Sequence, residues 1–313
     1  MTTMKAVRIH SFGGREAMRY EDAPRPEPDE GEVLIKVQAA GVNPVDWKVR
    51  EGYLEDFLPH QLPLILGWDV AGVIEAVGEG VGEWNVGEAV FAKLYTGGDG
   101  GYAEYALAKS FLVARRPATL DALHAAGIPI AGQTAWQALF DVAQLSAGQT
   151  ILIHTGAGGV GTFAVQFAKW KGAHVITTVS AEHHDFVCSL GADQCIDYRT
   201  QKFEELVHDV DVVLDTVGRD TQARSWQTLK RGGILVSIVD EGSFGHAMHH
   251  GVRAEYLFLK ESGKQLEEVG ALIGTGAVKV ILAEVLPLAE AVRAHEIIEA
   301  KHTRGKIVLK VSD

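Results

Sequence analysis

The sequence predicts an α/β protein made of a β-rich lobe and a doubly wound parallel sheet. Over the first ~120 residues, short apolar runs are separated by Gly, Pro and Asp turns, which is typical of an all-β unit. Further along, six strand patterns alternate with helical patterns, which indicates crossover connections and a parallel sheet. The length of 313 residues is about twice the ~150-residue prior for one domain, so two lobes are expected.

The first lobe is expected to contain one helix, Pro44 to Arg50, with Asn43 as its N-cap and Pro44 at its first position. The parallel sheet is expected from strands at Thr150–His154, His174–Thr178, Cys195–Asp197, Val210–Asp215, Ile234–Ile238 and Tyr256–Leu259. Two amphipathic helices and a strand should follow, at Lys264–Thr275, Leu288–Ala300 and Lys306–Val311.

Composition excludes several classes of partner. The formal net charge is -12 and no Lys/Arg cluster occurs, which argues against a nucleic-acid or anionic-membrane surface. The most apolar stretch, Leu62–Val77, is short and contains Asp69 and Glu75, so no membrane span is expected. The N-terminus lacks the apolar run of a signal peptide, and the two cysteines, Cys188 and Cys195, imply no disulfide framework. We therefore expect a cytoplasmic location.

The strongest local signal is the glycine turn GAGGVG at residues 156–161. It follows an apolar strand, opens an amphipathic helix and leads into a second strand within ~30 residues, which is the context of a dinucleotide-binding turn. Gly156 allows the tight turn, Gly158 lets the backbone approach a pyrophosphate, and Gly161 lets the helix pack on the sheet. The helix N-terminus adds free N–H groups and a positive dipole. A glycine turn that binds no ligand is the alternative.

The residue after the second strand indicates which dinucleotide binds. NAD sites usually carry Asp or Glu there to bind the ribose 2′-hydroxyl, whereas this chain has Ser180. A hydroxyl leaves room for a 2′-phosphate, which a carboxylate would repel. Glu182 counts against this interpretation, while His183 and His184 could help to neutralise a phosphate. We expect NADPH to be preferred over NADH.

Several stretches resemble the medium-chain dehydrogenase/reductase superfamily, and in particular its zinc-independent quinone oxidoreductase (zeta-crystallin-like) branch. Besides the glycine turn they are, in chain order, Ala40–Trp47, Gly67–Gly72, Gln133–Trp136, Ser189–Asp193, Asp197–Arg199 and Arg304–Leu309. The resemblance implies a GroES-like domain from residues 1–125 and 264–313, a Rossmann dinucleotide-binding domain over 126–263, and an active site in the cleft between them. It also implies cofactor contacts at Thr134, Gly158, Gly159, Val160, Ser180, Tyr198, Val217 and Ile238. Relatives often place a basic residue just after the position of Ser180, and this chain departs from that pattern.

The resemblance also bears on metal binding. Zinc-dependent relatives carry a Cys at the position of Asn43, a His at that of Trp68, and a Cys or Asp ahead of the glycine turn. Amide and indole groups are not Zn²⁺ ligands, and Gly127–Thr134 contains no Cys, His, Asp or Glu. No Cys precedes Cys188, so the four-cysteine structural loop is missing too. We expect no metal. The rival cluster His246-x-x-His249-His250 is interpreted as a solvated loop.

A site without a metal favours conjugated acceptors. Reduction of a simple ketone builds a localised alkoxide, whereas reduction of an enone or quinone builds a delocalised anion that hydrogen-bond donors can stabilise. Asn43 and Tyr53 are the candidate polarising groups, because both lie in the segment that resembles the substrate-side loop of the family. The alternatives are helix N-capping by Asn43, which would leave its NH₂ free, and a surface position for Tyr53. The proton donor stays open among water, Tyr53 and a cofactor hydroxyl.

The predicted function is NADPH-dependent hydride transfer to a quinone or an α,β-unsaturated carbonyl compound. One alternative is an enoyl-thioester reductase, which would need a basic patch for the carrier, and none is evident. The other is a non-enzymatic NADPH-binding sensor or structural protein. A homodimer is expected, because an apolar edge strand at Tyr256–Leu259 invites pairing with its symmetry mate and because the resemblance implies the same.

Overall fold

The computed structural model describes residues 2–312, which divide into two compact units. Unit 1 comprises Met1–Ile130, Glu261–Thr275 and Val280–Asp313. Unit 2 comprises Ala131–Lys260 and Gly276–Lys279. The N-terminal and C-terminal parts of the chain therefore belong to the same unit, and unit 2 is inserted between them in the sequence.

Unit 1 is built on two sheets. A seven-stranded sheet has the order β15-β16-β3-β5-β6-β8, with β7 paired to β3, and a three-stranded sheet has the order β2-β1-β4. The strands are β1 Thr3–Ile9, β2 Met18–Pro24, β3 Glu32–Val42, β4 Leu64–Ile65, β5 Asp69–Val77, β6 Ala89–Lys93, β7 Tyr105–Lys109, β8 Val113–Arg115, β15 Leu282–Pro287 and β16 Lys306–Lys310. Strand β16 pairs antiparallel with β3, which joins the tail to the first lobe. Strand β15 was not expected, because its residues are mostly half-buried or exposed and form no continuous apolar run.

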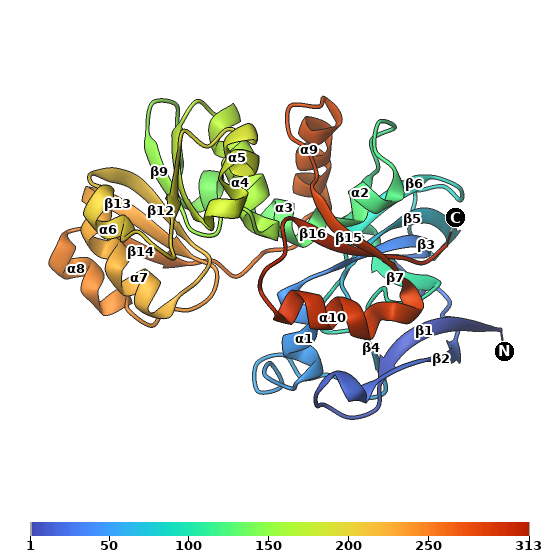
Figure 1. Ribbon diagram of the computed structural model, residues 1–313. Coiled ribbons are helices and arrows are strands. Elements are labelled where there is room, and N and C mark those ends of the chain that lie inside the picture. Colours follow the sequence, from blue (N-terminus) through green and yellow to red (C-terminus); the bar gives the residue numbers. More distant parts are fainter. Residues whose placement is uncertain (1, 313) are drawn as a thin grey trace. The chain divides into compact units, whose positions relative to one another are not determined.

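Unit 1 also contains helices. They are α1 Pro44–Arg50, α2 Ala122–Ala126, α9 Gly263–Gly274 and α10 Ala291–Glu299, with short 3₁₀ turns η1 Arg15–Ala17, η2 Ser110–Leu112 and η7 Leu288–Glu290. Figure 1 shows α10 beside α1, although some 240 residues of chain separate them. The fully buried Arg50 of α1 joins the two helices, because it donates to Glu299 at 2.8 Å and contacts His295 at 3.0 Å.

Unit 2 is a six-stranded, wholly parallel sheet of order β11-β10-β9-β12-β13-β14. Its strands are β9 Thr150–Ile153, β10 His174–Val179, β11 Gln194–Asp197, β12 Val210–Asp215, β13 Leu229–Ser237 and β14 Arg253–Tyr256. The helices are α4 Gly159–Trp170, α5 His184–Ser189, α6 Phe203–Leu206, α7 Arg219–Ser225 and α8 Ala247–His250, with α3 Pro129–Trp136 leading in and running into the π-helical turn η3 Gln137–Val142. In Figure 1, α4 and α5 gather on one side of this sheet, and α6, α7 and α8 on the other. This is a doubly wound arrangement.

The predicted fold class, a GroES-like β-rich domain plus a Rossmann domain, is confirmed. One strand was placed wrongly: β14 is Arg253–Tyr256 and not Tyr256–Leu259. Its position is set by the parallel register with β13, from Ile234 opposite Arg253 to Ser237 opposite Tyr256. The apolar run Tyr256–Leu259, on which the prediction was based, begins at the last residue of this edge strand. Among the described residues, no helix is long and apolar enough to cross a membrane.

Candidate functional site: the glycine turn and a buried polar cluster

The glycine turn joins β9 to α4 at the carboxyl edge of the parallel sheet. A Cβ atom on Gly156 would lie 2.2 Å from the Thr177 hydroxyl oxygen, and one on Gly161 would lie 2.1 Å from the backbone oxygen of Thr155. Both positions therefore require glycine for close packing of strand, turn and helix. Gly158 is the N-cap residue of α4, and a Cβ there would meet only atoms of Thr155, at 3.3 Å or more. A side chain at Gly158 would therefore meet less steric conflict within the chain than one at Gly156 or Gly161.

The start of α4 offers hydrogen-bond donors. The first bond of the helix runs from the Thr162 N–H to the Gly158 carbonyl oxygen at 2.9 Å. The N–H groups of Gly159, Val160 and Gly161 therefore precede the helical ladder and have no acceptor within it. Together with the helix dipole they form an arrangement that suits a phosphate group.

Two neighbouring strand ends carry a polar group of three residues. Ser180 follows β10, is 5% exposed, and its hydroxyl donates to a carboxylate oxygen of Glu182 at 3.0 Å. Arg199, just beyond β11, lies 3.3 Å from the same carboxylate. The Ser180 hydrogen bond and then the Arg199 charge lower the pKa of Glu182. The exposed Tyr198 ring lies under the Arg199 guanidinium, 5.7 Å from it.

Sequence reasoning missed Arg199 as a member of this group. The parallel pairing of β10 with β11 places Val179 opposite Asp197, so the residues that follow the two strands meet. Arg199 and Glu182 are 17 positions apart in the chain, and no local sequence pattern indicates their contact. Arg199 thus brings a positive charge to Glu182, two residues after Ser180.

The buried carboxylate of Asp215 accepts hydrogen bonds from the backbone of the loop after β12. Asp215 is fully buried and accepts hydrogen bonds from the Val217 N–H at 3.0 Å and the Gly218 N–H at 2.8 Å. Its other oxygen accepts from the Ser237 hydroxyl at 2.9 Å. These bonds connect the ends of β12 and β13. Val217 and Ile238, two of the cofactor contacts expected from the resemblance, follow these strands.

The cofactor contacts that the sequence predicts can now be placed. Ser180, Tyr198, Val217 and Ile238 follow β10, β11, β12 and β13, so they lie at the same edge of the sheet as the turn after β9. Thr134, which is almost fully buried, lies in α3, outside the strand ends. Their contact with a cofactor stays a prediction. His154, directly after β9, is fully buried, and its ring nitrogens lie within hydrogen-bond distance of the Thr178 and Ser225 hydroxyl groups.

Unit 1 contains a buried polar cluster, which we define as Asn43, Asp46, Asp69, Tyr102 and Lys306. The Asn43 amide nitrogen donates to Asp69 at 2.8 Å, and its amide oxygen accepts from the Lys306 ammonium. Asp46 accepts from the Asn43 backbone N–H at 2.7 Å and from the Tyr102 hydroxyl at 2.8 Å. All five side chains are buried, and they come from α1, β5, β16 and the loop before β7.

The charges of this cluster perturb one another. Burial raises the pKa of Asp46 to about 7 and that of Asp69 to about 6, although Lys306 and the hydrogen bonds partly oppose it. Burial lowers the pKa of Lys306, and the two carboxylates counteract this. The second oxygen of Asp46, Oδ1, is buried without a hydrogen-bond partner among the described residues. Lys306 lies 3.9 Å from a carboxylate oxygen of Asp69, and the side chains of Asp46, Asp69 and Lys306 are all buried.

Asn43 differs from the expectation in one respect. It is the N-cap residue of α1, as predicted, but the NH₂ group that capping would leave free is engaged with Asp69. The sequence separation of 26 residues hides this pairing, which arises because the end of β3 and the start of β5 are neighbours in the sheet. The amide is consequently held in one orientation.

Tyr53 is not a member of the buried polar cluster. It lies in the turn after α1, is 66% exposed, and its ring meets Trp47 edge-on at 6.0 Å. The structure therefore gives Tyr53 the accessible position of a loop aromatic. Whether its hydroxyl meets a substrate stays a prediction.

Asn43 and Trp68, the two positions at which zinc-dependent relatives have metal ligands, form hydrogen bonds within the chain. The Trp68 indole N–H donates to the Gly98 carbonyl oxygen at 3.1 Å. Across residues 2–312, no three His, Cys, Asp or Glu side chains are grouped so that they could hold a metal ion. His246, His249 and His250 are exposed in and beside α8.

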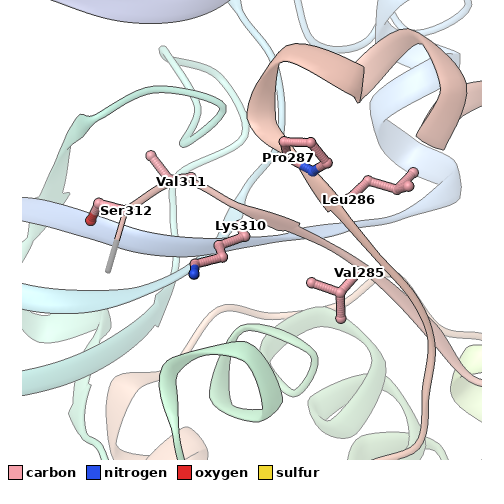
Figure 2. A pocket seen from close by; sticks show the side chains of 6 residues that line it. All are labelled: Val285, Leu286, Pro287, Lys310, Val311 and Ser312. Atoms are coloured by element: carbon pink, nitrogen blue, oxygen red, sulfur yellow. The ribbon is translucent and has the colours of Figure 1, made fainter.

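A surface cavity lies elsewhere in unit 1. Its volume is about 410 Å³, and Figure 2 shows its lining from β15 and the end of β16, namely Val285, Leu286, Pro287, Lys310, Val311 and Ser312. None of the site residues predicted from the sequence lines it. Its lining offers one charged group, Lys310, and no paired acid and base.

Comparison with known proteins agrees with the two-part fold. Residues 29–118 match the alcohol dehydrogenase GroES-like domain, and residues 190–309 match a family described as zinc-binding dehydrogenase. The chain is 34% identical to the chloroplast envelope quinone oxidoreductase homolog of Arabidopsis thaliana, over 98% of each chain. It is 35% identical to the NADPH-dependent alkenal/one oxidoreductase of the same plant, over 98% of this chain and 79% of that one. Among solved structures, the quinone oxidoreductase from Coxiella burnetii superposes with a TM-score of 0.93 at 37% identity, covering 99% and 100%.

Proposed function

Since the chain belongs to the medium-chain dehydrogenase/reductase superfamily, in its quinone oxidoreductase branch, we propose that it transfers hydride from NADPH to a quinone or an α,β-unsaturated carbonyl compound. The observation that carries this proposal is the arrangement at the carboxyl edge of the parallel sheet. There the N-terminus of α4 and the Ser180–Glu182–Arg199 group occupy adjoining strand ends. The N-terminus of α4 suits a pyrophosphate; in the second group the Ser180 hydroxyl and the Arg199 guanidinium are donors for a 2′-phosphate, which the Glu182 carboxylate opposes.

The residues fit the cofactor on steric and electrostatic grounds. The N–H groups of Gly159 and Val160 would bind the pyrophosphate, and Gly158 leaves its approach open. Ser180 and Arg199 would bind the 2′-phosphate, with Arg199 exchanging its partner Glu182 for the phosphate. When bound, NADPH supplies the hydride, and the protein supplies binding and orientation. The name of the alkenal/one oxidoreductase relative, which is NADPH-dependent, supports this choice.

Polarisation of the acceptor is assigned to Asn43 and Tyr53. An amide held by Lys306 and Asp69 is preorganised, so it does not need to reorient when charge develops on an acceptor oxygen. Tyr53 would add an accessible hydroxyl donor from the turn after α1. A hydrogen bond from either group stabilises a localised alkoxide less than a Lewis acid does. A delocalised anion is therefore the proposed product of hydride transfer.

The test uses one carbon skeleton as enone, saturated ketone and alcohol, together with a quinone, each with NADPH and NADH. Oxidation of NADPH by the enone and the quinone, and not by the ketone, is expected. Efficient oxidation of the alcohol would overturn the proposal, because that step needs an alkoxide-stabilising group. NADPH binding without turnover on any acceptor would favour a sensor or structural protein instead.

Zinc independence is part of the proposal, because Asn43 and Trp68 occupy the ligand positions. Protein purified without added metal should contain well under one equivalent of zinc, and a chelator should leave turnover unchanged. A stoichiometric zinc whose removal abolishes turnover would contradict it. A cytoplasmic location and a homodimer complete the proposal, and neither follows from the site itself.

A further inference from the structure

The two cysteines of the chain, Cys188 and Cys195, are brought into contact in unit 2. Cys188 lies in α5 and Cys195 in β11, and their Sγ atoms are 3.3 Å apart. We propose that this pair is an oxidation site, a dithiol that a peroxide converts into an intramolecular disulfide. The test counts thiols and measures mass, so it does not depend on the proposed reductase activity.

The surroundings give the two sulfurs different roles. Cys188 is exposed, so a small oxidant can reach it. Cys195 is half-buried, and burial followed by its hydrogen bond with Cys188 raises its pKa to about 12. Because the thiolate is the reactive form of a thiol, Cys195 is protected from direct oxidation, and Cys188 is the residue that meets the peroxide first. Once Cys188 is oxidised, its thiol no longer contributes to the raised pKa of Cys195, and Cys195 acts as the resolving thiol.

The two chemical steps balance. The Cys188 sulfur attacks a peroxide oxygen, the O–O bond breaks, Cys188 becomes a sulfenic acid, and the second oxygen leaves as water. The Cys195 sulfur next attacks the Cys188 sulfur, so the S–S bond forms while the S–O bond breaks, and the departing hydroxide takes the Cys195 proton to leave as water. Two thiols lose two electrons, and hydrogen peroxide is reduced to two water molecules.

The geometry needs only a small adjustment. A disulfide has an S–S distance of about 2.04 Å, so the sulfurs must approach by roughly 1.3 Å. Both residues flank one short turn that reverses at Gly191, whose φ of +112° lies in the region that favours glycine. The cysteines are seven positions apart, which keeps the resolving thiol close to any sulfenic acid formed on Cys188. Sulfenic acid should therefore be captured before it is oxidised further.

The experiment counts thiols and measures mass on the full chain, which has no other cysteine. Treatment with a small excess of hydrogen peroxide should reduce the free thiols from two to none and lower the monomer mass by about 2 Da, the two thiol hydrogens. Dithiothreitol should restore both values. Oxygen additions of about 16 Da or multiples of it in place of that loss, or a disulfide between two chains, would overturn the proposal.

Two variants separate the roles. In Cys195→Ala, the sulfenic acid on Cys188 has no resolving thiol, so dimedone should label it, whereas dimedone should label the wild type weakly. In Cys188→Ser, Cys195 should keep its thiol under the same peroxide treatment, because it is half-buried and protonated. Equal rates of thiol loss in Cys188→Ser and in the wild type would show that Cys188 is not the reactive thiol.

Discussion

The side-chain amide of Asn43 donates a 2.8 Å hydrogen bond to the carboxylate of Asp69, and both groups are buried. Lys306 approaches this pair from β16, where it also donates to the Val42 carbonyl oxygen at 2.9 Å. The pair thus joins three strands of the seven-stranded sheet and α1 through polar contacts. The Asn43 amide is therefore held in one orientation by a carboxylate and an ammonium group.

Cofactor preference should depend on Ser180 and Arg199. Ser180→Asp places a carboxylate where the 2′-phosphate is expected, and Arg199→Gln removes a cation from the same group. Each change should lower the affinity for NADPH relative to NADH by on the order of 10- to 100-fold, because charge-assisted hydrogen bonds contribute roughly 1.5–3 kcal/mol each. Fluorescence titration of both cofactors measures the ratio.

Matched controls for this prediction are Ser146→Asp and Arg231→Gln, which make the same charge changes at exposed positions away from these strand ends. They should leave the ratio of affinities unaltered. If Ser180→Asp and Arg199→Gln behave like the controls, the Ser180–Glu182–Arg199 group does not bind the 2′-phosphate.

Tyr53→Phe should lower turnover while leaving NADPH affinity nearly unchanged. Loss of one preorganised donor costs about 2.7–4 kcal/mol, or 100- to 1000-fold in turnover, and a delocalised anion places the expected loss near the lower end. Steady-state kinetics with an enone and a separate NADPH titration provide the two readouts. Tyr20→Phe, at a tyrosine that is also about half-exposed, is the control. Equal turnover in the two variants would make Tyr53 a surface aromatic only.

The contribution of Asp46 to stability should fall as pH rises from 5 to 7, while the buried His154 and His295, whose pKa values are lowered to about 4 and about 3, contribute in the opposite direction. The pKa of Asp46 is raised to about 7 in the folded protein, against an ordinary value of 3.8, so the folded state binds the extra proton in this interval. Its contribution is present at low pH and is lost as pH rises through about 7, by on the order of 2 kcal/mol between pH 5 and 7. The pKa of Lys306 is lowered by burial, which acts in the opposite direction.

Urea unfolding at pH 5 and pH 7 measures this difference. Asp46→Asn removes the titrating group, so the stability of the wild type relative to Asp46→Asn should fall by on the order of 2 kcal/mol from pH 5 to pH 7, while Asp69, His154 and His295 act in both proteins. An identical slope in wild type and Asp46→Asn would assign the pH dependence to other groups.

The sequence predicts a homodimer from an apolar edge strand at Tyr256–Leu259 and from the resemblance; the observed edge strand is β14, Arg253–Tyr256, whose far side has no strand partner among the described residues. Light scattering at micromolar concentration should give twice the monomer mass. Phe258→Lys, just beyond β14, should increase the monomer fraction, because it puts a charge at the proposed interface. Val86→Lys, at an exposed loop position, should not. A monomer mass for the wild type would rule the prediction out.

The order of the strands and helices could be predicted from the sequence because it depends on local patterns. Apolar periodicity marks the strands of the parallel sheet, and Asn43-Pro44 marks the start of α1. The glycine turn could be recognised because its steric demands lie within a few residues, as the close contacts around Gly156 and Gly161 confirm. Strand β14 was misplaced because an edge strand is positioned by its partner's register and not by its own apolar residues.

Only the tertiary structure decided which polar side chains meet. Arg199 reaches Glu182 because β10 and β11 are parallel neighbours, and Lys306 reaches Asn43 because β16 pairs with β3 across more than 260 residues of chain. A single sequence contains no periodic signal for such contacts, since they depend on strand order and register. The sequence by itself thus determined that a dinucleotide-binding turn is present. The long-range packing of the sheets determined which charges surround it and how the Asn43 amide is held.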